Sequence, residues 1–204
     1  MQGWPAVLAD GPVGLRPLRM RDAPVWSELR RRNAQWLAPW EATPPGEPAG
    51  VRVGPASFAA LLRVARRETR LGTALPFAVT YRSALAGQLT IGNIVHGSAC
   101  SAYAGYWLDG ALAGRGIMPT ALALAVDHCF ATVGLHRVEA NVRPENEASR
   151  RVVEKLGFRA EGIRRRFLHI SGRWCDHVCY AATVEDVPEG MVRRWHARRS
   201  DTLA

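Results

Sequence analysis

The sequence predicts a single α/β domain whose sheet is mainly antiparallel and flanked by helices. Its 204 residues suit one ordinary domain. Hydrophobic residues make up 48% of the chain and charged residues 22%, a balance that allows a sizeable core and argues against disorder. Three strand-like segments, 75–82, 85–95 and 101–108, are separated only by short turns, which is typical of an antiparallel meander. We expect one domain over residues 1–204, with its core at about 12–185 and a C-terminal extension at 186–204.

The segments before the meander alternate between regular and irregular structure. They comprise a strand (12–18), a helix that starts after Asp22 and ends near Asn33, an aromatic segment (36–41), a Pro/Gly loop (44–54) and a second helix (about 57–70). Asp22 is a favourable N-cap residue, and Pro24 suits a first helical turn. In the second helix Phe58, Leu62 and Ala65 lie on one stripe opposite arginines, so this face is expected to be buried.

The segments after the meander predict helices between further strands. In order they are an apolar helix (about 116–133), a strand (137–142), a helix (about 146–156), two strands (158–170 and 174–184) and a short helix through about 195. Gly157 is placed to end the second of these helices. Ser-Gly-Arg at 171–173 marks a hairpin between the last two strands.

Arginine dominates the charge of the chain. Lys and Arg total 27 against 18 acidic residues, which gives a net charge of +9, and Lys155 is the only lysine. Guanidinium groups bind phosphates and planar anions well. This composition favours a polyanionic partner such as the ribosome or a nucleic acid, or a phosphate-rich cofactor.

Cysteine usage indicates the compartment in which the chain works. Four cysteines, at 100, 129, 175 and 179, do not form the pattern of a disulfide-rich domain, and residues 1–10 lack a basic segment followed by an apolar one. We therefore expect a reducing, cytoplasmic environment. Residues 83–108 carry no charged side chain, but their polar residues and the alternation at 88–91 indicate strands and not a membrane span.

A glycine turn precedes the apolar helix. Gly114-Arg115-Gly116 lies between the strand that ends near Leu108 and the helix that starts near Ile117, so free backbone N–H groups meet the positive end of the helix dipole. This arrangement predicts a pyrophosphate-binding loop, although glycines serve any tight turn equally well. The sequence contains neither a Rossmann fingerprint nor a Gly-Lys-Ser/Thr phosphate loop.

A second block of sequence carries a family resemblance. It runs Leu-His-Arg-Val-Glu-Ala-Asn-Val-Arg-Pro-Glu-Asn-Glu-Ala-Ser-Arg at 135–150 and Glu-Lys-Leu-Gly-Phe at 154–158. With the glycine turn it resembles the GNAT acyltransferase superfamily, and within it the RimJ/RimL branch of protein N-terminal acetyltransferases, most of all the RimJ ribosomal-protein alanine acetyltransferases. The RimJ-like features are Trp40-Glu41, Gly105-Tyr106, His136-Arg137, Gly157-Phe158 with Glu161-Gly162, and Gly172-Arg173-Trp174 with Asp176-His177.

The resemblance implies a single GNAT domain with a mixed, mainly antiparallel sheet, and acetyl-CoA as co-substrate. Two positions depart from the family pattern: Ala111 stands where Gln or Arg is usual, and Thr120 stands where an acidic residue is frequent. The residues that the resemblance assigns to acetyl-CoA are Trp107, Leu108, Gly114, Arg115, Gly116, Ile117, Asn146 and Ser149.

Catalytic roles follow from the same resemblance. Ser149 is expected to donate a proton to the CoA sulfur, and Asn146 to bond the pantetheine amides, but each residue equally suits a helix start. The backbone N–H groups around Trp107 and Leu108 are expected to polarise the acetyl carbonyl.

Three acids compete for the acceptor side of the reaction. By resemblance Trp40 and Glu41 border the acceptor channel, and we rank Glu41 first as the anchor of the acceptor amine. Asp176 is a further substrate-binding candidate, and the general base stays open among Glu41, Glu161, Asp176 and water. A terminal α-amine has a pKa of about 8, against about 10.4 for lysine, so it demands little from a base.

No metal is expected, although three potential ligands share one strand face. Cys175, His177 and Cys179 alternate along the last strand, so neighbouring members lie about 7 Å apart. This spacing is too wide for adjacent ligands of one tetrahedral zinc.

We therefore expect an enzyme that acetylates the N-terminal α-amine of a protein, a ribosomal protein being the expected substrate, by direct attack in a ternary complex. One alternative is an acetyltransferase for a small amine such as an antibiotic or polyamine. Another is a non-catalytic CoA- or RNA-binding module. The sequence leaves the oligomeric state and contact with the ribosome open.

Overall fold

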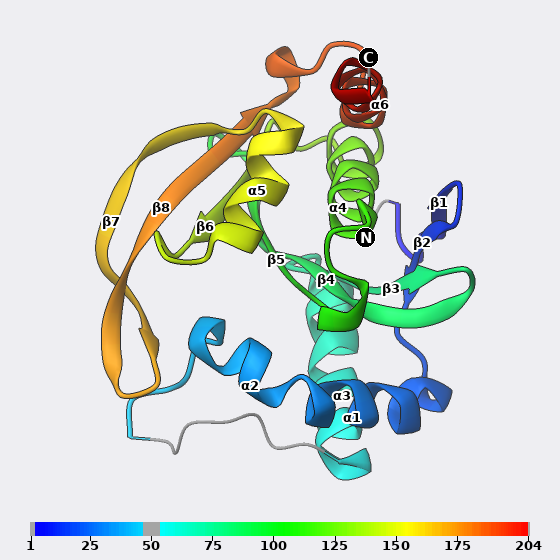
Figure 1. Cartoon of the computed structure of the whole chain (residues 1–204), viewed down its shortest axis with the longest axis vertical. Coiled ribbons are helices and arrows are strands. Elements are labelled where there is room, and N and C mark those ends of the chain that lie inside the picture. The colour runs from blue at the N-terminus through cyan, green and yellow to red at the C-terminus, as the bar shows by residue number, and fades with distance from the viewer. Residues whose placement is uncertain (1–2, 47–53, 204) are drawn as a thin grey trace.

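The computed structural model describes residues 3–46 and 54–203, in which helices cover both faces of one sheet (Figure 1). The strands are β1 (Leu8–Asp10), β2 (Val13–Pro17), β3 (Leu75–Tyr81), β4 (Ala84–Val95), β5 (Ser101–Leu108), β6 (Arg137–Val142), β7 (Arg159–Ile170) and β8 (Arg173–Thr183). The helices are α1 (Ala23–Arg32), α2 (Ala34–Leu37), α3 (Pro55–Leu71), α4 (Ile117–His128), α5 (Glu147–Leu156) and α6 (Met191–Leu203). Short 3-10 helices cover Met20–Asp22, Ala38–Trp40, Gly110–Leu112 and Val184–Asp186.

The sheet is mixed and mainly antiparallel, as expected from the sequence. Its strand order is β1-β2-β3-β4-β5-β6-β8-β7, and neighbouring strands are antiparallel except β5 and β6. The parallel pairing runs only from Ser101–Arg137 to Tyr103–Glu139, whereas β5 continues to Leu108. The two strands therefore separate beyond Tyr103, and this separation positions the site described below.

Alternation along the central strands divides the core into two parts. Phe77 and Val79 of β3 belong to the larger core, which also contains residues of α4 and α5 and Trp195 of α6. Ala78, between them, belongs to a smaller core with Trp26 of α1 and with α3. Helices α4, α5 and α6 therefore lie on one face of the sheet, and α1 and α3 lie on the other (Figure 1).

Several elements differ from the sequence-based expectation. Strand β1 was not expected, because its three residues are too short to show a periodicity. The aromatic segment is helical, as α2 and the Ala38–Trp40 turn. Helix α6 continues to Leu203, well beyond the expected end near 195. The expected apolar helix is α4 followed by a π-helical turn at Cys129–Val133.

Asp22 holds the N-terminus of α1 in a different way from the expected cap. It occupies the N-cap position, but α1 donates no hydrogen bond to its side chain. Instead its carboxylate accepts hydrogen bonds from the Arg16 guanidinium and from the Arg19 backbone N–H, all at 2.8 Å. Of the expected loop at 44–54, residues 47–53 lie outside the described residues.

Two expectations concern the whole chain: reduced cysteines and no membrane-spanning segment. All four cysteines are free thiols. Within the ranges described above, no helix combines the length and the apolar character that crossing a bilayer requires.

Candidate active site

A cavity of about 800 Å³ opens where β5 and β6 separate. This volume is within the range of small-molecule and cofactor sites. It is lined by the 36–41 segment, strands β4 and β5, the loop into α4 with the first residues of that helix, and α5 with its N-cap. Its lining residues are Trp36, Leu37, Trp40, Glu41, Gln88, Thr90, Gly105, Tyr106, Trp107, Leu108, Ala113, Gly114, Gly116, Ile117, Met118, Pro119, Asn146, Ala148, Ser149, Arg151, Val152 and Lys155.

The cavity brings together most of the residues assigned from the sequence. Trp107 and Leu108 contribute from β5, and the glycine turn with Ile117 contributes from the start of α4. Asn146, Ser149, Trp40 and Glu41 line it as well. Arg115 is not among the described residues that line the cavity. Its side chain is exposed, and its guanidinium donates a hydrogen bond to the Ala111 carbonyl at 3.5 Å.

The glycine turn has the backbone conformation that anion binding requires. Gly114 and Gly116 have φ values of +81° and +76°, in the left-handed region where side chains other than glycine are strained. Gly116 is the N-cap of α4, and both glycines line the cavity, so the turn lies at the positive end of that helix.

A buried carboxylate fixes the start of this loop. Asp109 accepts hydrogen bonds from the Asn33 amide (2.9 Å) and the Ala111 backbone N–H (3.4 Å), and forms an ion pair with Arg32. Desolvation raises the pKa of Asp109, but the hydrogen bonds from Asn33 and Arg32 outweigh it, so the pKa lies below its ordinary value. The loop is thereby attached to the end of α1 by a carboxylate that stays ionised.

Thr120, which stands where the family frequently has an acidic residue, helps to hold the same loop in place. The Thr120 hydroxyl donates to the Gly116 carbonyl at 2.9 Å and accepts from the Trp195 indole N–H at 2.9 Å. An acidic side chain at this position would place a negative charge beside the loop. Threonine keeps that part of the loop neutral while linking it to α6.

Ser149 and Tyr106 form a hydroxyl pair across the opening between α5 and β5. The Ser149 hydroxyl donates to the Tyr106 phenol oxygen at 2.9 Å, and the phenol donates to the Ser149 carbonyl at 3.3 Å. Burial raises the pKa of the Tyr106 phenol, so this group remains protonated at neutral pH. In the sequence Tyr106 stands out only as part of the Gly105-Tyr106 motif, because a contact with a residue 43 positions away leaves no local signal.

Asn146 starts helix α5, which is one of the two roles that the sequence predicts for it. It is the N-cap of α5, and its side-chain oxygen accepts a hydrogen bond from the Ser149 backbone N–H at 3.0 Å. One amide therefore fixes both the start of α5 and the position of Ser149, and the Asn146 side chain still lines the cavity.

Glu41 lines the cavity and forms an ion pair with a buried arginine. Its carboxylate forms an ion pair with Arg30, whose side chain is only 5% exposed. The Arg30 guanidinium lies between the rings of Trp26 and Trp107, 5.8 Å and 5.2 Å from their centroids. The carboxylate is thus held rigidly, and its charge is largely offset before any acceptor arrives.

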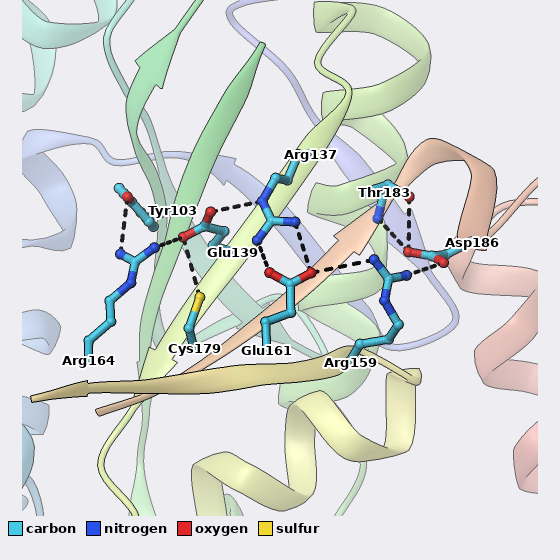
Figure 2. A network of polar contacts seen from close by, with 9 residues as sticks. All are labelled: Tyr103, Arg137, Glu139, Arg159, Glu161, Arg164, Cys179, Thr183 and Asp186. Atoms are coloured by element: carbon cyan, nitrogen blue, oxygen red, sulfur yellow. Dashed lines mark hydrogen bonds and ion pairs between the residues drawn. The ribbon is translucent and has the colours of Figure 1, made fainter. Parts of the chain in front are cut away.

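The two other acids proposed for the acceptor side lie elsewhere. Glu161, on β7, pairs with Arg137 and Arg159 in a polar network that crosses β5 to β8 (Figure 2). The hydrogen bond from Arg137 lowers the pKa of Glu161, which makes this carboxylate a weak base. Asp176 accepts a hydrogen bond from the Arg166 backbone N–H at 2.7 Å within the β7–β8 hairpin. The cavity lining of the described residues includes neither acid, so its geometry gives no support to an acceptor role for Asp176.

The three potential metal ligands of β8 are buried but differently engaged. His177 has its Nδ1 3.0 Å from the Cys175 carbonyl oxygen, and the Cys179 thiol donates to Glu139 at 3.6 Å. Throughout the described ranges, no group of three or more His, Cys, Asp and Glu side chains is arranged to hold a metal ion.

Comparisons with known proteins agree with this geometry. Residues 13–159 match the family described as the acetyltransferase (GNAT) domain. RimJ of Mycobacterium smegmatis, solved in complex with CoA-disulfide, is similar in structure, with a TM-score of 0.91, 43% sequence identity and 96% of each chain covered. The ribosomal protein uS5 alanine N-acetyltransferase of Escherichia coli strain K12 is 30% identical over 178 residues, 86% of this chain and 90% of that protein. The probable N-acetyltransferase YjcK of Bacillus subtilis strain 168 is 46% identical over 93 residues; this match spans 46% of the chain and 51% of YjcK, about half of each.

Proposed function

The chain belongs to the GNAT acetyltransferase family, and on this premise we propose that it transfers the acetyl group of acetyl-CoA to the N-terminal α-amine of a protein, a ribosomal protein being the expected substrate. The observation that carries the proposal is the shape of the cavity. It runs from the glycine turn at the start of α4 to the Trp36–Glu41 segment. Two substrates that enter from these two ends would meet beside Tyr106 and Ser149.

The residues present fit acetyl-CoA as the co-substrate. Gly114 and Gly116 offer N–H groups for its pyrophosphate, and Arg151 and Lys155 add positive charge to the same part of the lining. The edge of β5 beyond Tyr103 has no strand partner on the β6 side among the described residues. Its backbone N–H groups near Trp107 and Leu108 are therefore suited to polarise the acetyl carbonyl.

The proposed reaction needs two proton movements. The neutral amine nitrogen of the acceptor bonds to the thioester carbonyl carbon, the carbon–sulfur bond breaks, and the amine gives up a proton. In the structure the Ser149 hydroxyl donates to the Tyr106 phenol oxygen; in the reaction it turns to the leaving thiolate and protonates it, and water returns to the serine oxygen the proton that the amine gave up. Because the α-amine has a pKa of about 8, water suffices as its base in this proposal.

Two observations favour a protein terminus over a polyamine or antibiotic. Glu41 is the one carboxylate in the described lining of the cavity, and it is neutralised by Arg30. A multiply charged small amine would need several unpaired carboxylates. The relatives with a named substrate include an enzyme that modifies an alanine of ribosomal protein uS5, and the net charge of +9 suits work near ribosomal RNA.

The proposal can be tested with a cell extract. The protein is incubated with isotopically labelled acetyl-CoA and extract, and acetylated termini are mapped by mass spectrometry. We expect label on a protein N-terminus beginning with a small residue, and no label in a matched reaction with the Gly114/Gly116 double valine variant. Label confined to lysine side chains or to small amines would contradict the proposal, and so would a chain that binds CoA without turnover.

A further inference from the structure

We propose that the C-terminal helix α6 forms part of the CoA site and that Arg199 binds a phosphate group of CoA. This inference rests on the proposed function, since it concerns the same co-substrate. It goes beyond it in assigning a binding role to the segment that follows the matched GNAT region.

The start of α6 is fixed against α4. The Asp127 carboxylate, on α4, accepts hydrogen bonds from the backbone N–H groups of Met191 (2.5 Å) and Val192 (3.0 Å). A side chain of α4 therefore satisfies the free N–H groups at the beginning of α6. Figure 1 shows the two helices side by side.

Trp195 then attaches α6 to the glycine turn itself. Its side chain is 4% exposed, and its indole N–H bonds to Thr120, which in turn donates to the Gly116 carbonyl. A Cβ on Gly116 would lie only 3.4 Å from the indole ring atom Cζ2. The turn and this part of α6 thus form one packed unit.

Arg199 follows one helical turn later on the same face of α6. Its guanidinium lies over the Trp195 ring, 5.4 Å from the centroid, and its Nη1 is 3.8 Å from where a Cβ on Gly116 would lie. Among the side chains that the structure describes, which end at Ser200, no carboxylate pairs with Arg199, whereas Arg193 on the same helix pairs with Glu189 at 4.0 Å.

Arg199 is exposed beside the N-terminus of α4, which carries partial positive charge. An anion bound beside the turn would be attracted by both. A phosphate ester supplies that anion and matches the fork of N–H donors on arginine. The indole ring of Trp195 keeps the guanidinium in position for it.

Helix α6 also contacts the opposite wall of the cavity. The Arg198 guanidinium donates to the carbonyls of Glu154 (3.1 Å) and Lys155 (3.4 Å) at the end of α5. Lys155 lines the cavity, as the glycine turn does. The helix therefore spans the two walls at the end where the phosphates of CoA would lie.

Calorimetric titrations with CoA and with 3′-dephospho-CoA test the inference. Arg199→Gln is compared with the wild-type chain, with Arg199→Lys, and with Arg193→Gln as a matched control on the same helix. We expect Arg199→Gln to weaken CoA binding about tenfold, the effect of losing one charge-assisted hydrogen bond. Arg199→Lys should retain part of the affinity, and Arg193→Gln should bind CoA as the wild type does.

The second ligand identifies the phosphate. If Arg199→Gln lowers the affinity for CoA and for 3′-dephospho-CoA equally, Arg199 binds the pyrophosphate. If it lowers the affinity for CoA alone, Arg199 binds the 3′-phosphate. If the wild-type chain binds CoA and Arg199→Gln binds it within twofold, the inference is wrong while the proposed function stands. If the wild-type chain does not bind CoA, the proposed function fails and the inference fails with it.

Discussion

Replacing Glu41 by glutamine separates two roles of one carboxylate. Glu41 lines the cavity, where it is proposed to anchor the acceptor amine, and it pairs with Arg30. Arg30 is nearly fully buried, and its Nε finds no hydrogen-bond partner among the described residues. Glutamine keeps an oxygen that can accept from Arg30 but removes the negative charge. The substitution therefore leaves a buried guanidinium without a counter-charge.

The size of the loss follows from this geometry. Breaking a buried ion pair by removing one partner costs about 3–5 kcal/mol. Glu41 is 23% exposed, and the amide oxygen and the rings of Trp26 and Trp107 still contact Arg30. We therefore expect a loss of about 1–2 kcal/mol in the free energy of unfolding. For a chain of this length that corresponds to a fall in Tm of about 2–8 °C.

Glu41→Gln should raise the KM for the acceptor less than the loss of an unpaired carboxylate would. Because Arg30 already offsets the charge of Glu41, the ammonium loses about 1 kcal/mol of attraction, or about a fivefold rise in KM for the acceptor peptide. Acetyl-CoA affinity should be nearly unchanged, because Glu41 is not among the residues assigned to acetyl-CoA and Arg30, which contacts Trp107, is kept.

The assay combines thermal melting with steady-state kinetics on peptides that begin with Ala or Ser. Glu28→Gln is the matched control, because Glu28 pairs with Arg31 at 2.6 Å on the exposed side of α1 and should contribute less than about 0.5 kcal/mol. A Tm for Glu41→Gln equal to that of the control would refute the buried pair. An unchanged acceptor KM would refute the anchoring role.

Three further predictions concern the co-substrate and stability. Replacing Gly114 and Gly116 by valine should abolish the rise in Tm that acetyl-CoA produces, because valine is strained at these positive φ values; a folded variant that binds normally would show the loop to be misassigned. Ser149→Ala should lower kcat about 10–100-fold with little change in acetyl-CoA affinity, and Tyr106→Phe should do so more weakly, as measured by kinetics beside calorimetry. The lowered pKa of Asp109 stabilises the fold at neutral pH, and this contribution is lost as the pH falls through that lowered value. In acid unfolding curves Asp109→Asn should therefore be less stable than the wild type at pH 7 and show less loss of stability below about pH 4; parallel curves would contradict this linkage.

Local signals in the sequence accounted for the regular elements. The glycine in the left-handed region at 157, φ +77°, ends α5, and Asn146 starts it as an N-cap. The meander of β3 to β5 followed from apolar runs and short turns. Where the signal is a residue type at a fixed distance along the chain, the prediction needs no knowledge of the tertiary structure.

The site depends instead on contacts between distant parts of the chain. Tyr106 meets Ser149 because β5 and α5 face each other, and Arg30 meets Glu41 because α1 and the following segment fold against the cavity. Helix α6 is joined to the glycine turn through Trp195, far from it along the chain. None of these pairings has a period or a motif, so the sequence predicts Ser149 and Glu41 as site residues but not their partners Tyr106 and Arg30, nor the role of Trp195.

The short parallel junction between β5 and β6 also shapes how the molecule opens. Three residue pairs join β1–β5 to β6–β8–β7, and one contact of Figure 2, the hydrogen bond from Arg164 to the Tyr103 phenol at 3.2 Å, crosses the same seam. One hydrophobic core extends under both halves, so this short strand pairing is the place where the sheet itself is least held together. We therefore expect amide hydrogens along the seam to exchange with solvent at a lower free energy than those of the meander. Any molecule that contacts both halves should slow this local opening of the sheet. Exchange protection at the seam therefore reports occupancy of the cavity without any measurement of turnover.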